Sequence, residues 1–439
     1  MDKKIIAIIA VAVIVIAGAA AFFMLNGDKN KDTNRNGENS DYGDETMYKG
    51  VMNVYGNANM DADIDSKDAD FIKSIIDKKT SWNKTANPFA DTNSDGVIDS
   101  KDLDQVNKLI KRTSGTVVRF VDGNDKISTA TLPLSKIVMS GANGPELICL
   151  ALGFTKNEVL MYDVFPNDPA NPGSLFQNFK GVTAVSNVNL ADYDATTSAG
   201  IPDAIIYNNY SDDSLTDEQL KKYADAGIAL IPSKSMEGSI GDFALALGYL
   251  FDKVDKAKAF SNWCNKVIDK IDEATAKIKK SDYPSVLYWY GGQAAAGTGS
   301  VYNELLASMG ATNIADWEGD YKVLNKDNCT WVLDYDPDYV FRTVGFFGYD
   351  TTEDALKTQF DNYGSMISQL NAYKEDRYVF VAGVLPQILR MAYLASYIHP
   401  TELGADFGNE CHKELIQMYG IDYDVDKHPF IVDGKHWKS

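Results

Sequence analysis

The sequence predicts an α/β protein with two Rossmann-like lobes joined by one long helix, preceded by a small all-α domain and an N-terminal transmembrane helix. Three observations predict this arrangement. A strand, a Gly-rich loop and a helix, followed by Pro-Asp before another strand, occur twice, from residue 136 and again from residue 285. One amphipathic helical pattern at 252–280 separates the two copies, and residues 5–25 are apolar. Two similar lobes imply a cleft between them, where small ligands usually bind.

The length and charge of the chain limit its organisation and its partners. At 439 residues it is too long for one hydrophobic core, and about three domains are expected. Its formal net charge of -20 argues against a nucleic-acid partner, because no basic stripe is available to displace phosphate counterions. The predicted segments are an anchor or signal at 1–27, a disordered linker at 28–50, a double-loop domain at 51–113, a first lobe at 114–252, a spanning helix at 253–281 and a second lobe at 282–439.

The apolar run at residues 5–25 is long enough to cross a bilayer as a helix, which takes about 20 residues. Lys3 and Lys4 precede it and favour a cytoplasmic N-terminus. We therefore expect a single-pass protein of the cell membrane with its domains on the extracytoplasmic side. Small residues at 17–21 offer a signal-peptidase site as an alternative. The apolar residues that follow them favour a retained anchor, and either interpretation exports the chain.

Two twelve-residue segments, at 57–68 and 91–102, carry oxygen-bearing side chains at positions 1, 3, 5, 9 and 12. A calcium loop surrounds its hard cation with ligands at this spacing and adds a position-7 carbonyl. We expect calcium in both loops, bound more tightly in the second, where Gly96 supplies the sharp turn and Ala62 stands in the first. The candidate ligands are Asn57, Asn59, Asp61, Asp63, Asp65 and Asp68 in the first loop, and Asp91, Asn93, Asp95, Val97, Asp99 and Asp102 in the second.

Each of these loops leads into an apolar-periodic helix. Asp at position 12 and a single helix per loop make residues 51–112 resemble a type I dockerin, an EF-hand-like domain. The resemblance implies a cohesin as protein partner. The alternative is a calcium-rigidified spacer that holds the following domain away from the membrane.

After residue 115 the chain alternates strand and helix patterns, which indicates parallel βα units. The alternating strand candidates lie at 136–140, 158–164, 204–208 and 229–233, after a β-like stretch at 116–122, and helical patterns lie at 146–152 and 217–226. The pattern at 252–280 predicts the spanning helix, with Asp252 or Asp255 as its N-terminal cap. A single helix between the lobes is expected to act as a stiff hinge.

The order and spacing of these segments resemble a family of transport proteins. The matching pieces include LPLSKIVMSGANGPELICLALGF from residue 132, IPDAIIYNN from 201, GTGSVYNELLASMGATNIADW from 297 and LDYDPDYVFRT from 333. They are similar to the substrate-binding proteins of ABC importers for iron complexes and cobalamin, the helical-backbone group of periplasmic binding proteins. The resemblance, which covers about 132–423, implies a non-enzymatic protein that captures an iron chelate or a corrinoid and delivers it to an ABC permease.

Ligand contacts in parallel α/β lobes gather at the carboxyl ends of the strands. The free amide groups at 140–144, before a helix N-terminus, would attract an anion. Arg342 is the sharpest single candidate, because an Arg among apolar neighbours needs a counter-charge, either from a carboxylate-bearing siderophore or from a structural Asp. The candidate ligand-binding residues are Ser140, Gly141, Asn143, Tyr162, Tyr207, Trp289, Tyr290, Arg342 and Leu385.

The four histidines and the four cysteines limit the metal chemistry of the lobes. The histidines, at 399, 412, 428 and 436, all lie in the predicted second lobe, whereas a bare transition metal between lobes usually needs ligands from both. A chelated or organic ligand is therefore favoured. The cysteines show no CxxC spacing, and any disulfide pairing stays open.

The same resemblance implies one acidic docking residue on each lobe, which would meet arginines of the permease. Asp194 and Glu304 lie near the matching positions. The alternative function is a dockerin-bearing cell-surface enzyme, or a scaffold or adhesion protein, in a cohesin–dockerin assembly that acts on glycans. A hydrolase would need a carboxylate pair across a cleft, and neither a GxSxG nor an HExxH motif is present. The sequence therefore predicts a binding protein and not an enzyme.

Overall fold

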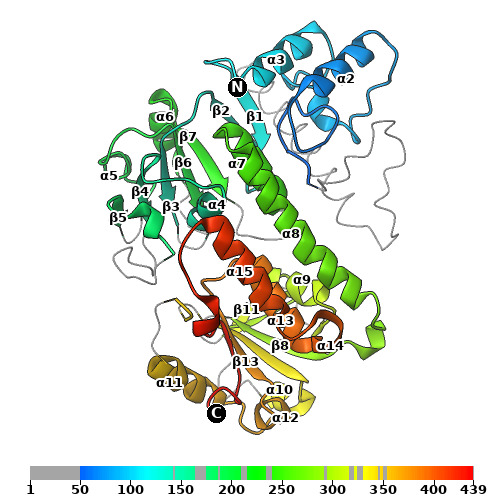
Figure 1. Cartoon of the computed structure of the whole chain (residues 1–439), viewed down its shortest axis with the longest axis vertical. Helices are drawn as coiled ribbons and strands as arrows, with labels where there is room; N and C mark the ends of the chain where they lie inside the picture. The colour runs from blue at the N-terminus through cyan, green and yellow to red at the C-terminus, as the bar shows by residue number, and fades with distance from the viewer. Residues whose placement is uncertain are drawn as a thin grey trace, which may run out of the picture.

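The computed structural model describes residues 50–141, 144–163, 175–185, 188–208, 215–233, 240–290, 294–315, 321–323, 330–344, 347–349 and 353–438. Figure 1 shows two α/β lobes at the two ends of a long helix, α8 (Val254–Thr275), with a small N-terminal module beside the upper lobe. Among these residues no helix is long and apolar enough to cross a membrane. The predicted anchor at 5–25 and the linker up to residue 49 lie outside the described residues.

The N-terminal module contains two helices of equal length, α2 (Ser66–Ile76) and α3 (Ser100–Ile110), and a short 3₁₀ turn, η1 (Pro88–Ala90). Asp65 and Asp99 begin the helices with capping boxes, in which each N-cap carboxylate accepts a backbone N–H and the Asp three residues later returns the contact. Ile72 of α2 and Val106 of α3 are fully buried and pack together in a small core. The two loop–helix units are therefore near copies in structure as well as in sequence.

The first lobe is a five-stranded parallel sheet in the order β5-β4-β3-β6-β7. The predicted strands at 136–140, 158–164, 204–208 and 229–233 and their parallel pairing are confirmed, because short apolar runs between turn signals leave little alternative. The predicted strand at 116–122 forms, but it pairs antiparallel outside this sheet. The strands are β3 (Ile137–Ser140), β4 (Val159–Asp163), β5 (Thr183–Val185), β6 (Ala204–Asn208) and β7 (Ala229–Ser233), and the helices are α4 (Pro145–Ala151), η2 (Gln177–Phe179), α5 (Tyr193–Thr196), α6 (Asp217–Asp225) and α7 (Ile240–Leu250). An antiparallel hairpin, β1 (Val117–Val121) and β2 (Ile127–Thr131), precedes the sheet.

The long helix α8 runs over Val254–Thr275 and is followed by a 3₁₀ turn, η3 (Lys280–Asp282). Its buried stripe includes Phe260, Cys264, Val267 and Ile271, the positions that the helical period predicts. The predicted cap is wrong. Lys253 occupies the N-cap position without a side-chain cap bond, because Asp252 has a positive φ of 58° and its carboxylate lies 3.4 Å from Arg112 Nε.

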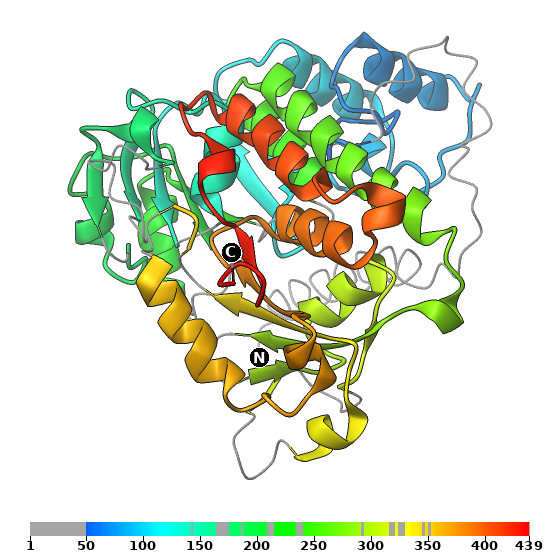
Figure 2. The same cartoon turned by 60° about the horizontal axis from the view of Figure 1, so that its bottom comes forward.

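The second lobe has a mixed sheet in the order β11-β9-β8-β12-β13-β14, with β10 paired to β8. Its strands β8, β12 and β13 are parallel, and β9, β11 and β14 add antiparallel edges. The strands are β8 (Ser285–Tyr290), β9 (Ala294–Ala296), β10 (Thr312–Asn313), β11 (Tyr321–Val323), β12 (Tyr339–Val344), β13 (Tyr378–Ala382) and β14 (Ile431–Val432). The helices are α9 (Val301–Ser308), α10 (Thr330–Tyr335), α11 (Glu353–Gly364), α12 (Asn371–Lys374), α13 (Gln387–Ile398), α14 (Pro400–Leu403), α15 (Phe407–Tyr419) and η4 (Val425–Lys427). Figure 2 shows α11 and α13 on opposite faces of this sheet.

A second connection between the lobes runs beside α8. Helix α15 lies along α8 (Figure 1), and the Trp263 indole donates a hydrogen bond to the carbonyl of Cys411 at 3.2 Å. The C-terminal end of α15 reaches the first lobe, where Asn178 Nδ2 donates to the carbonyl of Tyr419 at 3.0 Å and Gln177 Nε2 to that of Asp422 at 3.2 Å. The hinge therefore consists of α8 supported by α15, and not of α8 alone.

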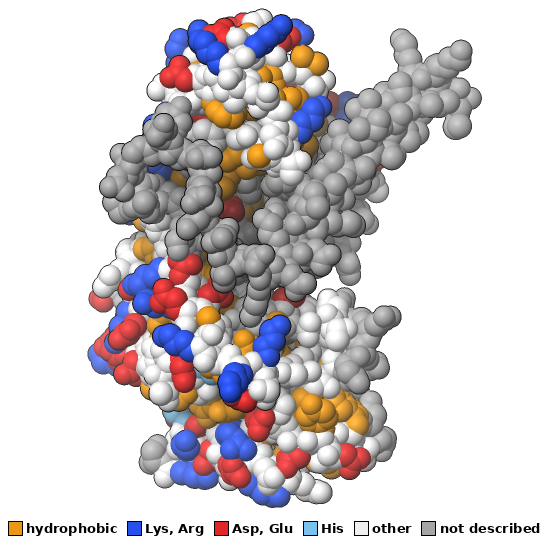
Figure 3. Space-filling view, turned by 90° about the vertical axis from the view of Figure 1, so that its right-hand side faces the viewer, with side chains coloured by type: hydrophobic (Ala, Val, Ile, Leu, Met, Phe, Trp, Pro, Cys, Tyr) orange, Lys and Arg blue, Asp and Glu red, His pale blue; other side chains and the backbone are white. Residues whose placement is uncertain are grey.

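Cys149, Cys264 and Cys411 are buried free thiols, and Cys329 lies outside the described residues. No disulfide therefore joins any two of the three buried cysteines. On the face shown in Figure 3, acidic and basic side chains are interspersed over the described surface, so neither sign of charge dominates it.

Candidate functional site

The carboxyl ends of β3 and β4 meet in a small polar cluster in the first lobe. The Ser140 hydroxyl donates a hydrogen bond to the carbonyl of Val188 at 2.6 Å. Asp163 Oδ2 accepts bonds from the amides of Gly141 at 3.3 Å and Val188 at 3.4 Å. Gly141 has φ +95°, and a Cβ there would lie 2.5 Å from Cβ of Asn208, so only glycine fits. The structure therefore brings together the predicted residues Ser140 and Gly141 and adds Asp163.

The other first-lobe candidates differ in accessibility. Tyr162 is fully buried, with its ring 5.5 Å from the ring of Phe176 and from that of Phe179. Tyr207, on β6, is half-buried, and burial raises its pKa above the ordinary tyrosine value. Asn143 lies outside the described residues. A ligand contact is therefore open to Tyr207 in this conformation and closed to Tyr162.

The sequence does not single out Glu146, yet this side chain is the most unusual one near the cluster. Glu146 is in the first turn of α4 and is fully buried, and neither carboxyl oxygen has a hydrogen-bond partner of good geometry among the described residues. Burial raises its pKa well above the ordinary value, and Asp163 raises it further. A Glu within the apolar run PELICLALGF is the signal that could have identified it.

Arg342 and Trp289 lie inside the second lobe. Their side chains are 2% and 1% exposed, on neighbouring strands β12 and β8, and face α11. Arg342 Cζ lies 3.4 Å from the ring centroid of Tyr363 on α11 and 4.6 Å from that of Trp289. Burial lowers the pKa of the guanidinium. Aromatic faces therefore surround this cation, and a contact of Arg342 or Trp289 with ligand stays a prediction that requires an opening beside α11.

Successive residues of β8 face opposite sides, as the alternation of a strand requires. Trp289 faces α11, whereas the ring of Tyr288 stacks on Tyr302 of α9 at 4.3 Å. Tyr288 Oη is 2.8 Å from Thr343 Oγ1, and Arg390 Nη1 donates to Tyr302 Oη at 2.9 Å. The sequence does not identify this network, because its members come from four separate segments.

Of the two remaining second-lobe candidates, Tyr290 ends a strand and Leu385 lies in the loop after one. Tyr290 is the last residue of β8 and pairs through its backbone with Ala294, and its side chain is not among the described ones. Leu385 is buried, and its carbonyl accepts a hydrogen bond from Arg390 Nε at 3.1 Å. The loop after β13 is therefore tied to the network of Arg390 through its backbone.

Each histidine has a neighbour in the second lobe. His399 Nε2 is 2.8 Å from the carbonyl of Met309, and His412 lies between the hydroxyls of two tyrosines. His428 stacks on Tyr423, and His436 Nε2 is 3.3 Å from Glu353. Among the described residues no three His, Cys, Asp or Glu side chains are grouped as metal ligands.

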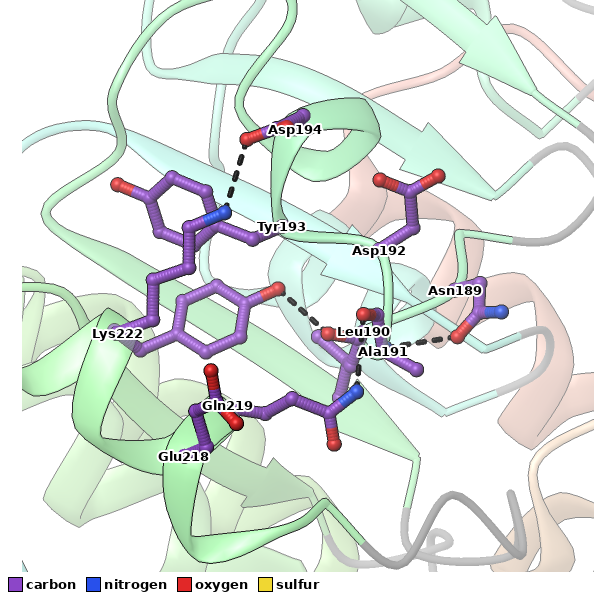
Figure 4. A pocket seen from close by; sticks show the side chains of 10 residues that line it. Asn189, Leu190, Ala191, Asp192, Tyr193, Asp194, Glu218, Gln219 and Lys222 are labelled. Carbon is purple, nitrogen blue, oxygen red and sulfur yellow. Dashed lines mark hydrogen bonds and ion pairs between the residues drawn. The ribbon is translucent and has the colours of Figure 1, made fainter.

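The predicted docking residues are both exposed and lie on different lobes. Asp194, on α5, is 3.1 Å from Lys222 Nζ of α6, beside a hollow of about 530 Å³. Figure 4 shows the ion pair between Asp194 and Lys222 among the residues that line this hollow. The hydroxyl of Tyr223, which also lines it, donates a hydrogen bond to the carbonyl of Leu190 at 2.8 Å. Glu304 is exposed on α9 of the second lobe. Both positions are accessible to a protein partner.

The two acidic loops of the module share one pattern of hydrogen bonds. In the second loop, Asp102 accepts bonds from the amides of Asn93 at 3.2 Å and Asp99 at 2.9 Å. In the first loop Asp68 accepts from Asn59 at 3.1 Å and Asp65 at 2.8 Å. The loops also differ at position 1. The Asp91 carboxylate accepts hydrogen bonds from the amides of Asp95 and Gly96. Among the described residues, Asn57 Oδ1 accepts only the amide of Asp61, the equivalent of Asp95, and the neutral Asn57 Nδ2 instead donates to the carbonyl of Met52 at 2.8 Å.

Comparison with known proteins gives one family. The family model described as "Periplasmic binding protein" matches residues 148–381, more than half of the chain. No curated protein matches the chain.

Solved structures share the fold at low sequence identity. A TroA-like periplasmic binding protein, FepB, from Veillonella parvula matches with a TM-score of 0.59 and 18% identity over 72% of this chain and 99% of that one. A solute binding protein of an ABC transporter from Sulfurospirillum deleyianum matches with a TM-score of 0.51 and 17% identity over 70% and 96% of the two chains. The molybdate-binding protein MolA from Haemophilus influenzae matches with a TM-score of 0.50 and 14% identity over 70% and 99%.

Proposed function

The chain belongs to the periplasmic binding protein family, the non-enzymatic solute-binding components of ABC transporters, and we propose that its own ligand is an iron chelate or a corrinoid. The ligand would lie between the lobes and be delivered to an ABC permease. The observation that supports this proposal most strongly is the placement of two sheets with parallel central strands at the two ends of α8. Parallel sheets bind ligands at their carboxyl ends, and two such sheets can hold one ligand from both sides.

The groups at those ends support the proposed ligand class. The first lobe offers the polar cluster of Ser140, Gly141 and Asp163, and the second offers aromatic residues around β8. A bare transition-metal ion would need a grouping of His and carboxylate ligands, which the described residues do not contain. A chelate that carries its metal within an organic shell needs only hydrogen-bond donors, acceptors and aromatic faces.

A thermal-shift screen of the full chain tests the ligand class. The probes are a ferric hydroxamate, a ferric catecholate, haem, cobalamin and, because one structural neighbour binds it, molybdate. A ligand that binds only the folded protein raises the melting temperature by mass action, by an amount that grows with its concentration. A shift with a chelate or corrinoid supports the proposal. A shift with molybdate alone, or with none of the probes, contradicts it.

We also propose that the module binds two calcium ions, as a separate property of the chain. Hard oxygen donors at calcium-loop spacing and the repeated hydrogen-bond pattern support this. In the described part of the chain, no three His, Cys, Asp or Glu side chains are grouped as metal ligands. The proposed second site therefore also needs the side chain of Asn93 and the carbonyl of Val97 as calcium ligands. The charged Asp91 in place of Asn57 makes the second loop the tighter site.

Calcium titration with variants tests this property. Asp95→Asn removes a proposed ligand, whereas Asp104→Asn removes an exposed carboxylate of α3 outside the loop. Calcium is expected to raise the melting temperature of the parent chain and of Asp104→Asn, and EDTA should reverse the rise. Asp95→Asn should lose part of it. Melting that EDTA leaves unchanged in the parent chain contradicts calcium binding.

Docking on a permease through Asp194 and Glu304, and membrane attachment through residues 5–25, complete the proposed function. The exposure of both acidic side chains supports the docking role. Anchoring is supported by the length of the apolar run alone.

A further inference from the structure

The N-terminal module is attached to the first lobe by an arginine at its C-terminal boundary. Arg112 donates hydrogen bonds to the carbonyls of Tyr249 and Leu250, at the C-terminal end of α7, the second at 3.1 Å. The C-terminus of a helix carries unpaired carbonyls and a partial negative charge. A guanidinium there donates hydrogen bonds to the carbonyls and is attracted by the charge. The Tyr249 hydroxyl returns a bond of 2.8 Å to the carbonyl of Leu109 in α3. Asp252 pairs with the same arginine, which is why it does not cap α8.

An ion pair connects the first acidic loop to the long helix. Lys258 Nζ, on the first turns of α8, lies 2.6 Å from Asp63 Oδ2. The lysine side chain is only 14% exposed, which is low for a residue whose charge prefers water. Nearby, the amide of Val51 donates to Asp242 Oδ1 of α7 at 3.0 Å. The module therefore touches both helices at the N-terminal end of the hinge.

The module and the lobe also share backbone pairing and one hydrophobic core. The amide of Val121 donates to the carbonyl of Asn53, and the amide of Tyr55 to that of Arg119, both at 2.9 Å. Val54 thus forms a single antiparallel β-bridge with Phe120 at the edge of the β1–β2 hairpin. Val54 is fully buried in the same core as Phe120. Separating the module would expose this apolar surface to water.

We propose that the module is an internal brace of the solute-binding domain, which holds the first turns of α8 against the first lobe, and not a freely moving docking arm. Its partner surface is the chain's own α7, α8 and β1–β2 hairpin. The module and the two lobes should therefore unfold as one cooperative unit. A spacer or cohesin-binding arm would instead need few contacts with the domain that follows it.

The brace also couples calcium binding in the module to the stability of the hinge helix α8. This step rests on the calcium binding proposed above. Asp63 occupies position 7 of the first loop, where the main chain would face the ion. Ordering this loop fixes the backbone of Asp63 and hence the partner of Lys258. Calcium should therefore stabilise the first turns of α8 and not only the module.

Amide hydrogen exchange of the calcium-free full chain tests the brace. Amides of α3, of β1 and of the first turns of α8 are expected to share one opening free energy, because they belong to one cooperative unit. Lys258→Met should lower the melting temperature by about 2–4 °C and speed exchange in α2 and α8 together. The control Lys266→Met removes a more exposed ion pair from the same helix and should change exchange in α2 by less than twofold. If α3 opens independently of β1 and α8, or if Lys258→Met leaves α8 unchanged, the brace is wrong.

A second arm adds calcium and separates the two proposals. If calcium slows exchange in the module and in the first turns of α8, and Lys258→Met confines the slowing to the module, the coupling is supported. If calcium slows only the module of the parent chain, the coupling fails while calcium binding stands. If calcium does not slow amide exchange in any segment, and the calcium-free chain opens as one cooperative unit, calcium binding fails and the brace stands.

Discussion

Ser285 and Asp338 are joined by three hydrogen bonds at the start of the second-lobe sheet: Asp338 Oδ2 accepts from the serine amide at 2.8 Å and from its hydroxyl at 2.7 Å, and the Asp338 amide donates to Ser285 Oγ at 3.0 Å. The first lobe repeats this contact, since Asp203 accepts bonds from the amide and the hydroxyl of Ser135 at 2.7 and 2.9 Å. Each aspartate belongs to a Pro-Asp pair directly before a central strand, β12 for Asp338 and β6 for Asp203. Each serine lies next to the neighbouring strand: Ser285 begins β8, and Ser135 lies just before β3. The sequence repeat is therefore a structural repeat that sets strand register in both lobes.

Asp338→Ala is expected to destabilise the chain by about 1–2 kcal/mol, because each lost hydrogen bond costs about 1 kcal/mol. Urea unfolding measures the free energy of unfolding. The control Asp334→Ala removes an exposed carboxylate of α10 and should cost less than about 0.5 kcal/mol. Equal effects of the two substitutions would show that the contact between Asp338 and Ser285 does not stabilise the second lobe.

Arg342→Ala is expected to cost about 2–4 kcal/mol in the absence of any ligand. The substitution removes a buried side chain that packs on Tyr363 and Trp289 and leaves a cavity between β12 and α11. Arg377→Ala, just before β13, is the matched control, because this arginine is more exposed and its ring contact, with Tyr339, is longer, at 5.8 Å. A normal unfolding free energy together with lost ligand binding would instead place Arg342 in the ligand site.

Because His412 is buried, the chain is expected to lose stability in acid. Burial between Tyr349 and Tyr393 lowers its pKa from the ordinary 6.5 to about 3. The unfolded chain takes up a proton below pH 6.5 and the folded chain does not, so the neutral histidine contributes stability above that pH, and the contribution falls as pH drops towards 3. The slope reaches about 1.4 kcal/mol per pH unit.

Urea unfolding between pH 7 and pH 4 measures this contribution. His412→Gln should flatten the fall in stability, while the matched variant His428→Gln, of an exposed histidine, should keep it. A fall that is the same in parent and His412→Gln would show that other groups govern acid unfolding.

Glu304→Lys and Asp194→Lys are expected to reduce ligand uptake by cells at least tenfold together, without changing the affinity of the purified protein for ligand. Reversing an exposed charge on each lobe opposes docking on permease arginines and leaves the lobes intact. Glu273→Lys, an exposed reversal on α8, is the control for charge alone. Uptake that survives the double reversal would remove these two residues from the docking surface.

Local patterns account for most of the two sheets. The strands β3, β4, β6 and β7 are apolar runs between turn residues, and Gly141 lies where only glycine fits. What the sequence does not predict comes from contacts between distant segments. Lys258 and Asp63 are 195 residues apart, and the aromatic partner of Arg342 comes from α11. The wrong cap at Asp252 has the same origin, because a local rule does not foresee that Arg112 binds this carboxylate.

Isothermal titration calorimetry of the full chain with a ferric siderophore panel and cobalamin tests the central claim most directly. We predict saturable binding of at least one of these compounds, with one ligand per chain and a negative heat-capacity change from burial between the lobes. The metal-free chelator should bind more weakly than its ferric complex. No heat of binding from any compound in the panel, in a chain that unfolds cooperatively, would contradict the assignment of an iron chelate or corrinoid as the ligand.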